Sequence, residues 1–111
     1  MSMEARLKAE LLVQAILRLY DHQMIPAYLR RRGDADAGDV LVKISLDRST
    51  ALLLAQARDG EGRAVWMKTG PAEDAAIEAQ LTKAISRDPD LWIVEAEDAK
   101  GRFPLDTPII G

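Results

Sequence analysis

The sequence contains no cysteine and a single histidine, His22. Disulfide bonds, thiolate ligands and a cysteine nucleophile are therefore excluded. A zinc site would need a second histidine or a cysteine, and no serine has an obvious activating base nearby in sequence, so a zinc site and a catalytic triad are both set aside. His22 itself lies near the end of an expected helix, where an imidazole commonly complements the negative end of the helix dipole.

The N-terminal part of the sequence lacks a long apolar run, because Glu4, Arg6, Lys8 and Glu10 interrupt it. That pattern argues against a signal peptide and against a membrane span. An excess of basic residues is missing too, since 15 Lys and Arg face 18 Asp and Glu, for a net charge of −3. A dedicated nucleic-acid-binding domain would carry a clear basic excess. We therefore expect a cytoplasmic protein with no membrane partner.

Aromatic residues are few, at 5% of the chain, so Leu, Ile, Val and Ala must fill most of a core. A length of 111 residues with 48% hydrophobic and 30% charged residues is typical of one folded domain. We expect residues 1–111 to form a single domain around one hydrophobic core.

The first part of the chain, residues 3–21, has the spacing of an amphipathic helix. Ser2 is placed to cap its first turn, and the helix must end before Pro26, which cannot continue it. The apolar positions that recur at helical spacing are Leu7, Leu11, Leu12, Ala15, Ile16 and Leu19.

The apolar period then changes to two, which predicts a series of strands. Asp59-Gly60 is a hairpin signal, and the link "LDRST" is also of hairpin length. Short links of this kind make neighbouring strands antiparallel. The predicted strands are 24–32, 39–46, 50–58 and 63–69.

A second helix follows, with Pro71 in its first turn, and it ends before Asp88-Pro89. Residues 91–97 form a fifth strand, and residues 104–111 an irregular tail. The predicted fold is α+β in the order α-β-β-β-β-α-β. We expect a twisted, mainly antiparallel sheet with two helices packed on one face and the other face partly open.

Three stretches resemble a small bacterial family catalogued as domain of unknown function 1491. They are "RRGDADAGDVLVK", "QARDGEGRAVWM" and "SRDPDLWIVEAED", and the similarity extends from the first helix to about Phe103. The resemblance implies a bacterial cytoplasmic protein. It implies no activity, cofactor or catalytic residue, so it transfers no functional site to this chain.

Three aspartates, Asp34, Asp36 and Asp39, follow a run of arginines and are bracketed by Gly33 and Gly38. Carboxylates can bind a hard cation, but a calcium loop read from the first aspartate fails at its fifth, sixth and twelfth positions. The other interpretation is a glycine-hinged turn between two strands, whose aspartates cap backbone groups. We favour the turn, with no bound cofactor, and leave ion binding open.

Two glutamates, Glu95 and Glu97, share one face of the last predicted strand, about 7 Å apart. Such a pair suits acid–base chemistry or cation binding. Leu91 and Ile93 have the same parity, however, so this face can equally change from core to solvent along the strand. We favour the second interpretation.

The two tryptophans are predicted to lie in different surroundings. Trp66 shares parity with Ala64 and Lys68, which suggests the open face of the sheet, where it could stack on a base or anchor a protein. Trp92 shares parity with the apolar Val94, which suggests the core.

We favour a small non-enzymatic protein-binding or adaptor module, which recognises another protein or itself through the open sheet face or an edge strand. The alternative is weak nucleic-acid binding through the basic central strands. A metal-dependent hydrolase centred on the three aspartates ranks last. No catalytic residue and no cofactor are assigned. The candidate interaction surface consists of Arg30, Arg32, Lys43, Arg63, Trp66 and Lys68.

Overall fold

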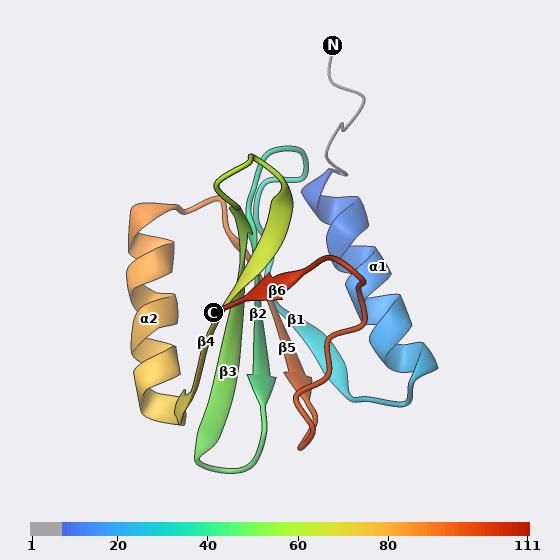
Figure 1. Ribbon diagram of the computed structural model, residues 1–111, viewed down its shortest axis with the longest axis vertical. Helices are drawn as coiled ribbons and strands as arrows, with labels where there is room; N and C mark the ends of the chain where they lie inside the picture. Colours follow the sequence, from blue (N-terminus) through green and yellow to red (C-terminus); the bar gives the residue numbers. More distant parts are fainter. Residues whose placement is uncertain (1–7) are drawn as a thin grey trace.

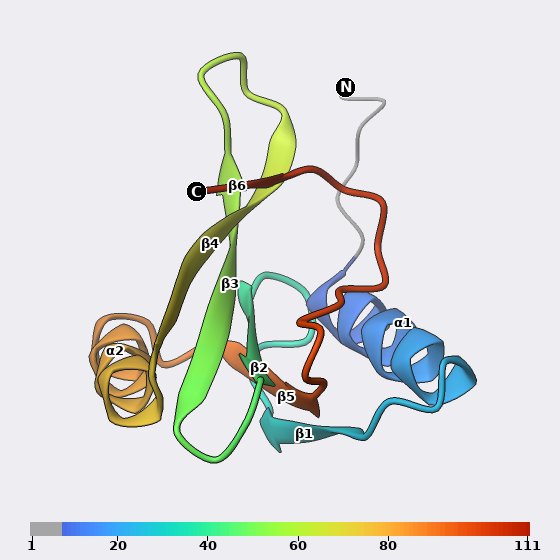
Figure 2. The same cartoon turned by 60° about the horizontal axis from the view of Figure 1, so that its bottom comes forward.

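The computed structural model describes residues 8–111, and in this part of the chain six strands form one mixed sheet with a helix on each side. The sheet is the middle layer in Figures 1 and 2, with strand order β1-β5-β2-β3-β4-β6. In chain order the elements are α1 (Ala9–His22), β1 (Ala27–Arg31), β2 (Val40–Ser45), β3 (Thr50–Arg58), β4 (Ala64–Glu73), α2 (Asp74–Arg87), β5 (Trp92–Glu97) and β6 (Ile109–Ile110).

Two hairpins and one long crossover set the strand order. β2, β3 and β4 pair as consecutive antiparallel strands, as their short links predict. The chain then crosses over through α2 and inserts β5 between β1 and β2, antiparallel to β1 and parallel to β2. The predicted order of elements is confirmed through β5. The sheet is mixed, however, because β5 pairs in parallel with β2 and β6 pairs in parallel with β4.

The two helices lie on opposite faces of the sheet, so the prediction that both pack on one face is wrong (Figure 2). α1 covers the face that presents Val40, Val42 and Ile44, whereas α2 covers the face that presents Leu41 and Leu53. The crossover explains the difference. α2 joins β4 to β5, which run in the same direction, and must pass over one face of the sheet, while α1 leads into edge strand β1 on the other.

α1 begins at Ala9 among the described residues, so the predicted start at Met3 and the cap at Ser2 lie outside them. The Tyr20 hydroxyl, on the buried side of this helix, donates a 2.8 Å hydrogen bond to the carbonyl oxygen of Arg102. This bond fastens the segment after β5 to α1. Within residues 8–111, neither helix has the length and apolar character needed to cross a membrane.

α2 begins later than the sequence predicts. Pro71 lies inside β4 rather than in the first turn of the helix, which starts at Asp74. Pairing with β3 explains the shift, because Thr50 at the start of β3 lies opposite Glu73 at the end of β4. Residues that carry local helix-start signals therefore pair with β3 as part of β4.

An aspartate closes the β3–β4 hairpin, as predicted. Asp59 Oδ1 accepts hydrogen bonds from the backbone N–H groups of Glu61 and Arg63, at 2.8 and 2.9 Å. The residue with a positive φ in this turn is Gly62, at 80°, and not Gly60. The tip of this hairpin projects beyond both helices (Figure 2).

The C-terminal tail contains a short strand that the sequence does not predict. Most of residues 104–111 lack regular structure, but Ile109–Ile110 form β6 parallel to Trp66 and Met67 of β4. The backbone N–H of Trp66 also donates a hydrogen bond to the carbonyl oxygen of Pro108, at 2.8 Å. The tail thus pairs with one edge of the sheet, and two residues are too short a run for a periodic pattern to reveal.

Candidate functional site

The link between β1 and β2 forms the predicted turn. The Asp34 carboxylate accepts hydrogen bonds from the backbone N–H groups of Asp36 and Ala37, at 3.1 and 2.7 Å. Within residues 8–111, the structure contains no group of three or more acidic or histidine side chains placed to bind one metal ion. Asp39 belongs to no such group either. The hypothesis of a metal-dependent hydrolase at this loop therefore has no geometric support.

This link packs against the start of β5. The Asp34 N–H donates to the Asp90 carbonyl oxygen at 3.0 Å, and the Trp92 indole N–H donates to the Asp34 carbonyl oxygen at 2.6 Å. The Arg32 guanidinium lies 5.2 Å from the centre of the Trp92 ring, within the usual range of a cation–π contact. Trp92 is 1% exposed, which confirms its prediction as a core residue.

Lys43 lies in a cluster of charged side chains on the α2 face of the sheet. Its side chain is 5% exposed, and its Nζ lies 2.6 Å from Asp74 Oδ1 and 2.5 Å from Glu78 Oε2. Arg30 bonds both carboxylate oxygens of Glu78, at 2.7 and 3.0 Å, and one of its nitrogens lies 3.0 Å from Glu95 Oε1. These pairs tie α2 to β1 and β2, and Arg30 also links β1 to β5 through Glu95.

Hydrogen bonds set the charge states in this cluster. Arg30, ahead of Lys43, lowers the pKa of the Glu78 carboxyl to about 2. Burial disfavours the charge on Lys43, but hydrogen bonds to Asp74 and Glu78 outweigh it, so the pKa of the amine is raised. Both groups are ionised at neutral pH. In these charge states the cluster joins α2 to the sheet through ion pairs.

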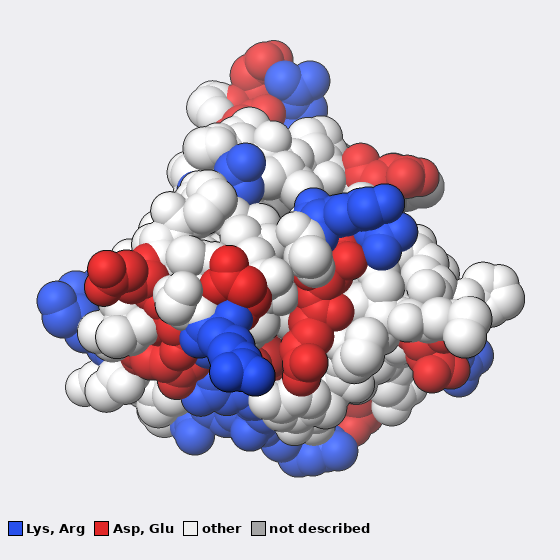
Figure 3. All heavy atoms as spheres, turned by 90° about the horizontal axis from the view of Figure 1, so that it is seen from below, with Lys and Arg blue, Asp and Glu red and all other residues white. Residues whose placement is uncertain are grey.

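Glu95 and Glu97 follow the favoured interpretation of their strand. Ile93, on the same face of β5, is 1% exposed, whereas Glu95 is half-buried and Glu97 is exposed. In the parallel register Glu95 lies opposite Lys43, and Glu97 lies opposite Ser45. At this end of the molecule, seen from below in Figure 3, acidic and basic side chains are interleaved over the visible surface.

Trp66 is buried, so the prediction that it lies on an open sheet face is wrong. Its exposed fraction is 2%, and it packs in the core on the α1 side. Its ring meets Phe103 edge to face, with the ring centres 4.9 Å apart. The segment that follows β5 covers this part of β4, and the parity of Trp66 alone cannot reveal that cover.

The basic residues predicted to form one interaction surface are spread over different parts of the molecule. Nucleic-acid binding stays a prediction, but it lacks the stacking platform on which it rested. Arg30 and Lys43 lie in the α2-face cluster, Arg32 lies over Trp92 near α1, Arg63 pairs with Asp59 at the hairpin tip, and Lys68 lies in β4.

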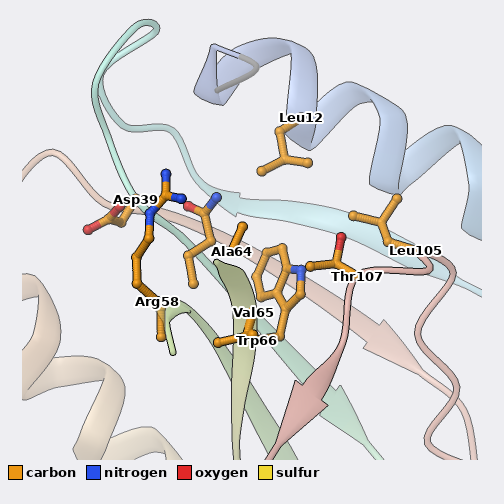
Figure 4. A pocket seen from close by; sticks show the side chains of 10 residues that line it. Leu12, Asp39, Arg58, Ala64, Val65, Trp66, Leu105 and Thr107 are labelled. Carbon is orange, nitrogen blue, oxygen red and sulfur yellow. The ribbon is translucent and has the colours of Figure 1, made fainter. Parts of the chain in front are cut away.

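A hollow of about 370 Å³ opens on the α1 face beside Trp66 (Figure 4). Its apolar walls come from three elements, with Leu12 on α1, Val65 on β4 and Leu105 in the C-terminal segment. Arg58 and other polar side chains also line it. Apolar walls with a few polar groups are the usual construction of a small-molecule site.

The sheet edge formed by β4 and β6 exposes a group of apolar side chains. Met67 is 42% exposed, Ile109 43% and Ile110 39%. We call these three residues the edge patch. They lie where a sheet presents unpaired backbone groups, which is where a further strand can add.

These features define a small α+β protein in which a mixed sheet is enclosed by one helix on each face. Within that class the assignment is specific. The chain belongs to the family described as "Protein of unknown function (DUF1491)", whose model matches residues 7–106. The resemblance seen in the sequence is thereby confirmed.

Solved structures agree with this assignment. The crystal structure of a family protein from Caulobacter crescentus CB15 is 35% identical, with a TM-score of 0.84, and the match covers 94% of this chain and 99% of that one. An NMR structure of a family protein from the same organism is 36% identical, with a TM-score of 0.81 and coverages of 95% and 97%. A solution structure of a protein from A. tumefaciens, 23% identical with a TM-score of 0.75 and coverages of 96% and 99%, shares the fold. No curated protein matches the chain.

Sequence reasoning misses the two acidic residues that pair with Lys43. Asp74 and Glu78 read as ordinary surface positions of a helix. A signal does exist, because residues 40–44 are apolar on both faces apart from Lys43, a pattern typical of a strand buried on both sides. A lysine inside such a run needs an acidic partner from the covering element.

Proposed function

We propose that this protein is a non-enzymatic protein-binding module, which recognises an extended aliphatic segment of a partner protein at the β4 edge of its sheet. The observation that carries the proposal is β6, because Ile109 and Ile110 lie along Trp66 and Met67 as a parallel strand. The chain's own C-terminal segment is thus an example of a peptide that fits this edge. Adding a strand to an exposed sheet edge is a common mode of peptide recognition.

The edge patch supports the chemistry assigned to the partner. Its side chains, Met67, Ile109 and Ile110, remain 42%, 43% and 39% exposed with β6 in place. The chain's own occupant of this edge is aliphatic, and a partner segment that replaces β6 must likewise be aliphatic and uncharged to gain from burial against Met67 of β4. Farther along the same strand, Pro71 has no N–H to offer, so the added strand belongs to the part of β4 that precedes it.

The chain's own segment is short enough to be displaced. Among the described residues, its strand pairing with β4 consists of two residues, and residues 104–108 lead to it without regular structure. A segment on so short a tether competes at an effective concentration on the order of millimolar. A partner segment that makes more pairs with β4 would therefore replace it.

We further propose that the module acts in the cytoplasm of a bacterium. The charges that interrupt the N-terminal part of the sequence support this location. The relatives from Caulobacter crescentus and A. tumefaciens support a bacterial source.

An amide NMR titration tests the proposal. The probe is the acetylated peptide LDTPIIG, which repeats residues 105–111, added to the wild-type chain and to the full-length double variant Ile109→Asp with Ile110→Asp. In the double variant we expect saturable shifts of the Trp66 and Met67 amide signals. The peptide should bind the variant at least roughly tenfold more tightly than the wild type, whose own segment competes for the edge.

The matched control is a peptide with aspartate at both isoleucine positions, which should leave the β4 signals in place. Analytical ultracentrifugation of the wild-type chain tests whether the partner is a second copy of the chain. A dimer that forms with rising concentration would show this. If millimolar LDTPIIG leaves the β4 amide signals of the double variant unchanged, the edge does not accept an added strand and the proposal fails.

A further inference from the structure

One residue that lines the hollow on the α1 face, Trp66, has an indole N–H with no acceptor among residues 8–111. Trp66 is 2% exposed, yet none of residues 8–111 accepts a hydrogen bond from its indole N–H. The other indole, that of Trp92, donates to the Asp34 carbonyl oxygen at 2.6 Å. Buried indole N–H groups usually find such a partner. The Trp66 indole nitrogen is not among the enclosed side-chain atoms of residues 8–111 that lack a partner, so its N–H is open to a molecule in the hollow.

The indole of Trp66 is held in place with its nitrogen toward the hollow. Its ring packs edge to face on Phe103, at 4.9 Å between centres and 63° between planes. In Figure 4 the nitrogen lies on the side of the ring that faces Thr107, one of the residues that line the hollow. A donor fixed in this way is preorganised for an acceptor that enters the hollow.

The walls of the hollow determine what else a ligand must be. Leu12, Val65 and Leu105 offer apolar contacts, and the volume of about 370 Å³ falls in the range of small-molecule sites. Arg58 and Asp39 both line the hollow and carry opposite charges, so a net charge on the ligand gains little from them. Moving a charge onto the apolar walls would also be unfavourable.

We propose that this hollow binds a small, neutral, mainly apolar molecule with a carbonyl or ether oxygen, and that this oxygen accepts the hydrogen bond of the Trp66 indole N–H. The apolar body of the ligand lies against Leu12 and Leu105. The site is distinct from the edge patch, although two of its lining residues, Leu105 and Thr107, belong to the segment that leads to β6.

The two indole N–H signals of the full-length chain provide the test, in a ¹H–¹⁵N NMR titration. The probe is 4-phenylbutan-2-one, which joins an apolar ring to one ketone oxygen. We expect the Trp66 indole signal to move downfield and to saturate at millimolar ketone. The Trp92 indole signal should stay in place, because that N–H is already bonded to Asp34.

Two variants test the contacts separately, with binding read from the methyl signals of Leu105. Trp66→Phe removes the donor and keeps an aromatic ring, and it should weaken ketone binding by roughly fivefold or more. Leu12→Ala shortens an apolar wall and should weaken binding by a similar factor. Leu11→Ala is the matched control, since Leu11 is 51% exposed on the same helix and does not line the hollow.

Three results would overturn the proposal. The first is a Trp66 indole signal that does not shift saturably in the wild-type chain. The second is equal movement of both indole signals, which marks a general solvent effect of the ketone. The third is an unchanged ketone affinity in Trp66→Phe, which would show that the indole N–H does not bind the ketone oxygen.

Discussion

A Cβ on Gly38 would lie 2.2 Å from the carbonyl oxygen of Asp90, so the β1–β2 link and the start of β5 approach more closely than a side chain permits. Gly33 meets the same oxygen, at 2.0 Å from a Cβ in its place. Neither glycine has a positive φ. The two glycines are therefore needed for a close approach of backbones, and not for the conformation of a chain reversal.

Replacing Gly38 with Ala should destabilise the fold by about 3 kcal/mol, because its Cβ would overlap a backbone oxygen that cannot move aside. Gly60→Ala is the matched control. Nothing lies within 4 Å of a Cβ at Gly60, and its φ is not positive, so its effect should stay within about 1 kcal/mol. Denaturant midpoints of the two variants decide, and similar losses at both positions would contradict the close-approach argument.

Removing Lys43 should cost less than removing its partners. Lys43→Met leaves Asp74 and Glu78 with side chains 39% and 36% exposed, so water can solvate their charges, and we expect a change below about 1 kcal/mol. The double variant Asp74→Asn with Glu78→Gln leaves an ammonium that is 5% exposed without its acidic partners, at a cost of about 3 kcal/mol. Chemical denaturation of both variants measures the asymmetry. Equal losses of unfolding free energy in the two variants would show that the cluster stabilises the fold through packing of its aliphatic side-chain atoms instead.

Acid should weaken the fold in part through Glu78. The pKa of its carboxyl is lowered from 4.5 to about 2 in the folded state, so its stabilising contribution is present above pH 4.5 and is lost as the pH falls toward 2. Because this side chain is 36% exposed, we expect about 1 kcal/mol, well below what the full shift implies. Glu78→Gln should flatten the stability–pH curve between these two values.

Asp98 provides an independent comparison in the same acid range. Hydrogen bonds from Arg102 lower the pKa of its carboxyl to about 2, so Asp98→Asn should flatten the curve as well. The two effects should add, because Asp98 and Glu78 share no hydrogen-bond partner. An unchanged acid dependence in Glu78→Gln would remove Glu78 from this account.

The aspartates of the β1–β2 link should differ in importance. Asp34→Ala loses hydrogen bonds of 3.1 and 2.7 Å to two backbone N–H groups, and should cost about 1 kcal/mol. Asp36→Ala loses an ion pair with Lys8 in which both side chains are about 70% exposed, and should cost less than about 0.5 kcal/mol. Melting temperatures of the two variants rank them, and a larger loss for Asp36→Ala would reverse the assignment.

The sequence by itself determined the secondary-structure elements through β5, the two hairpins and the family. Alternation over β2–β4 and turn chemistry at Asp59 act between residues a few positions apart, so their consequences are visible in the local pattern. Asp47 closes the other hairpin in the same local way, by accepting hydrogen bonds from the N–H groups of Ser49 and Thr50 at 2.8 and 2.9 Å.

Local sequence signals gave the wrong prediction where a segment distant in sequence packs against or pairs with the residue. Pro71 carries a helix-start signal, but strand pairing with β3 holds it in β4. Trp66 has the parity of an exposed position, but the segment with Phe103 covers it. In both cases the deciding partner is far away in sequence, and no periodicity near the residue records it.

The tertiary structure alone decided the placement of the helices and both candidate sites. The crossover through α2 puts that helix on the face opposite α1, and brings Glu78 to Lys43 and to Arg30, which precede it by 35 and 48 residues. The hollow beside Trp66 likewise needs walls from α1, β4 and the C-terminal segment together. Contacts of this kind depend on how long connections close and on their handedness, which leave no mark in the alternation of apolar residues along any one strand.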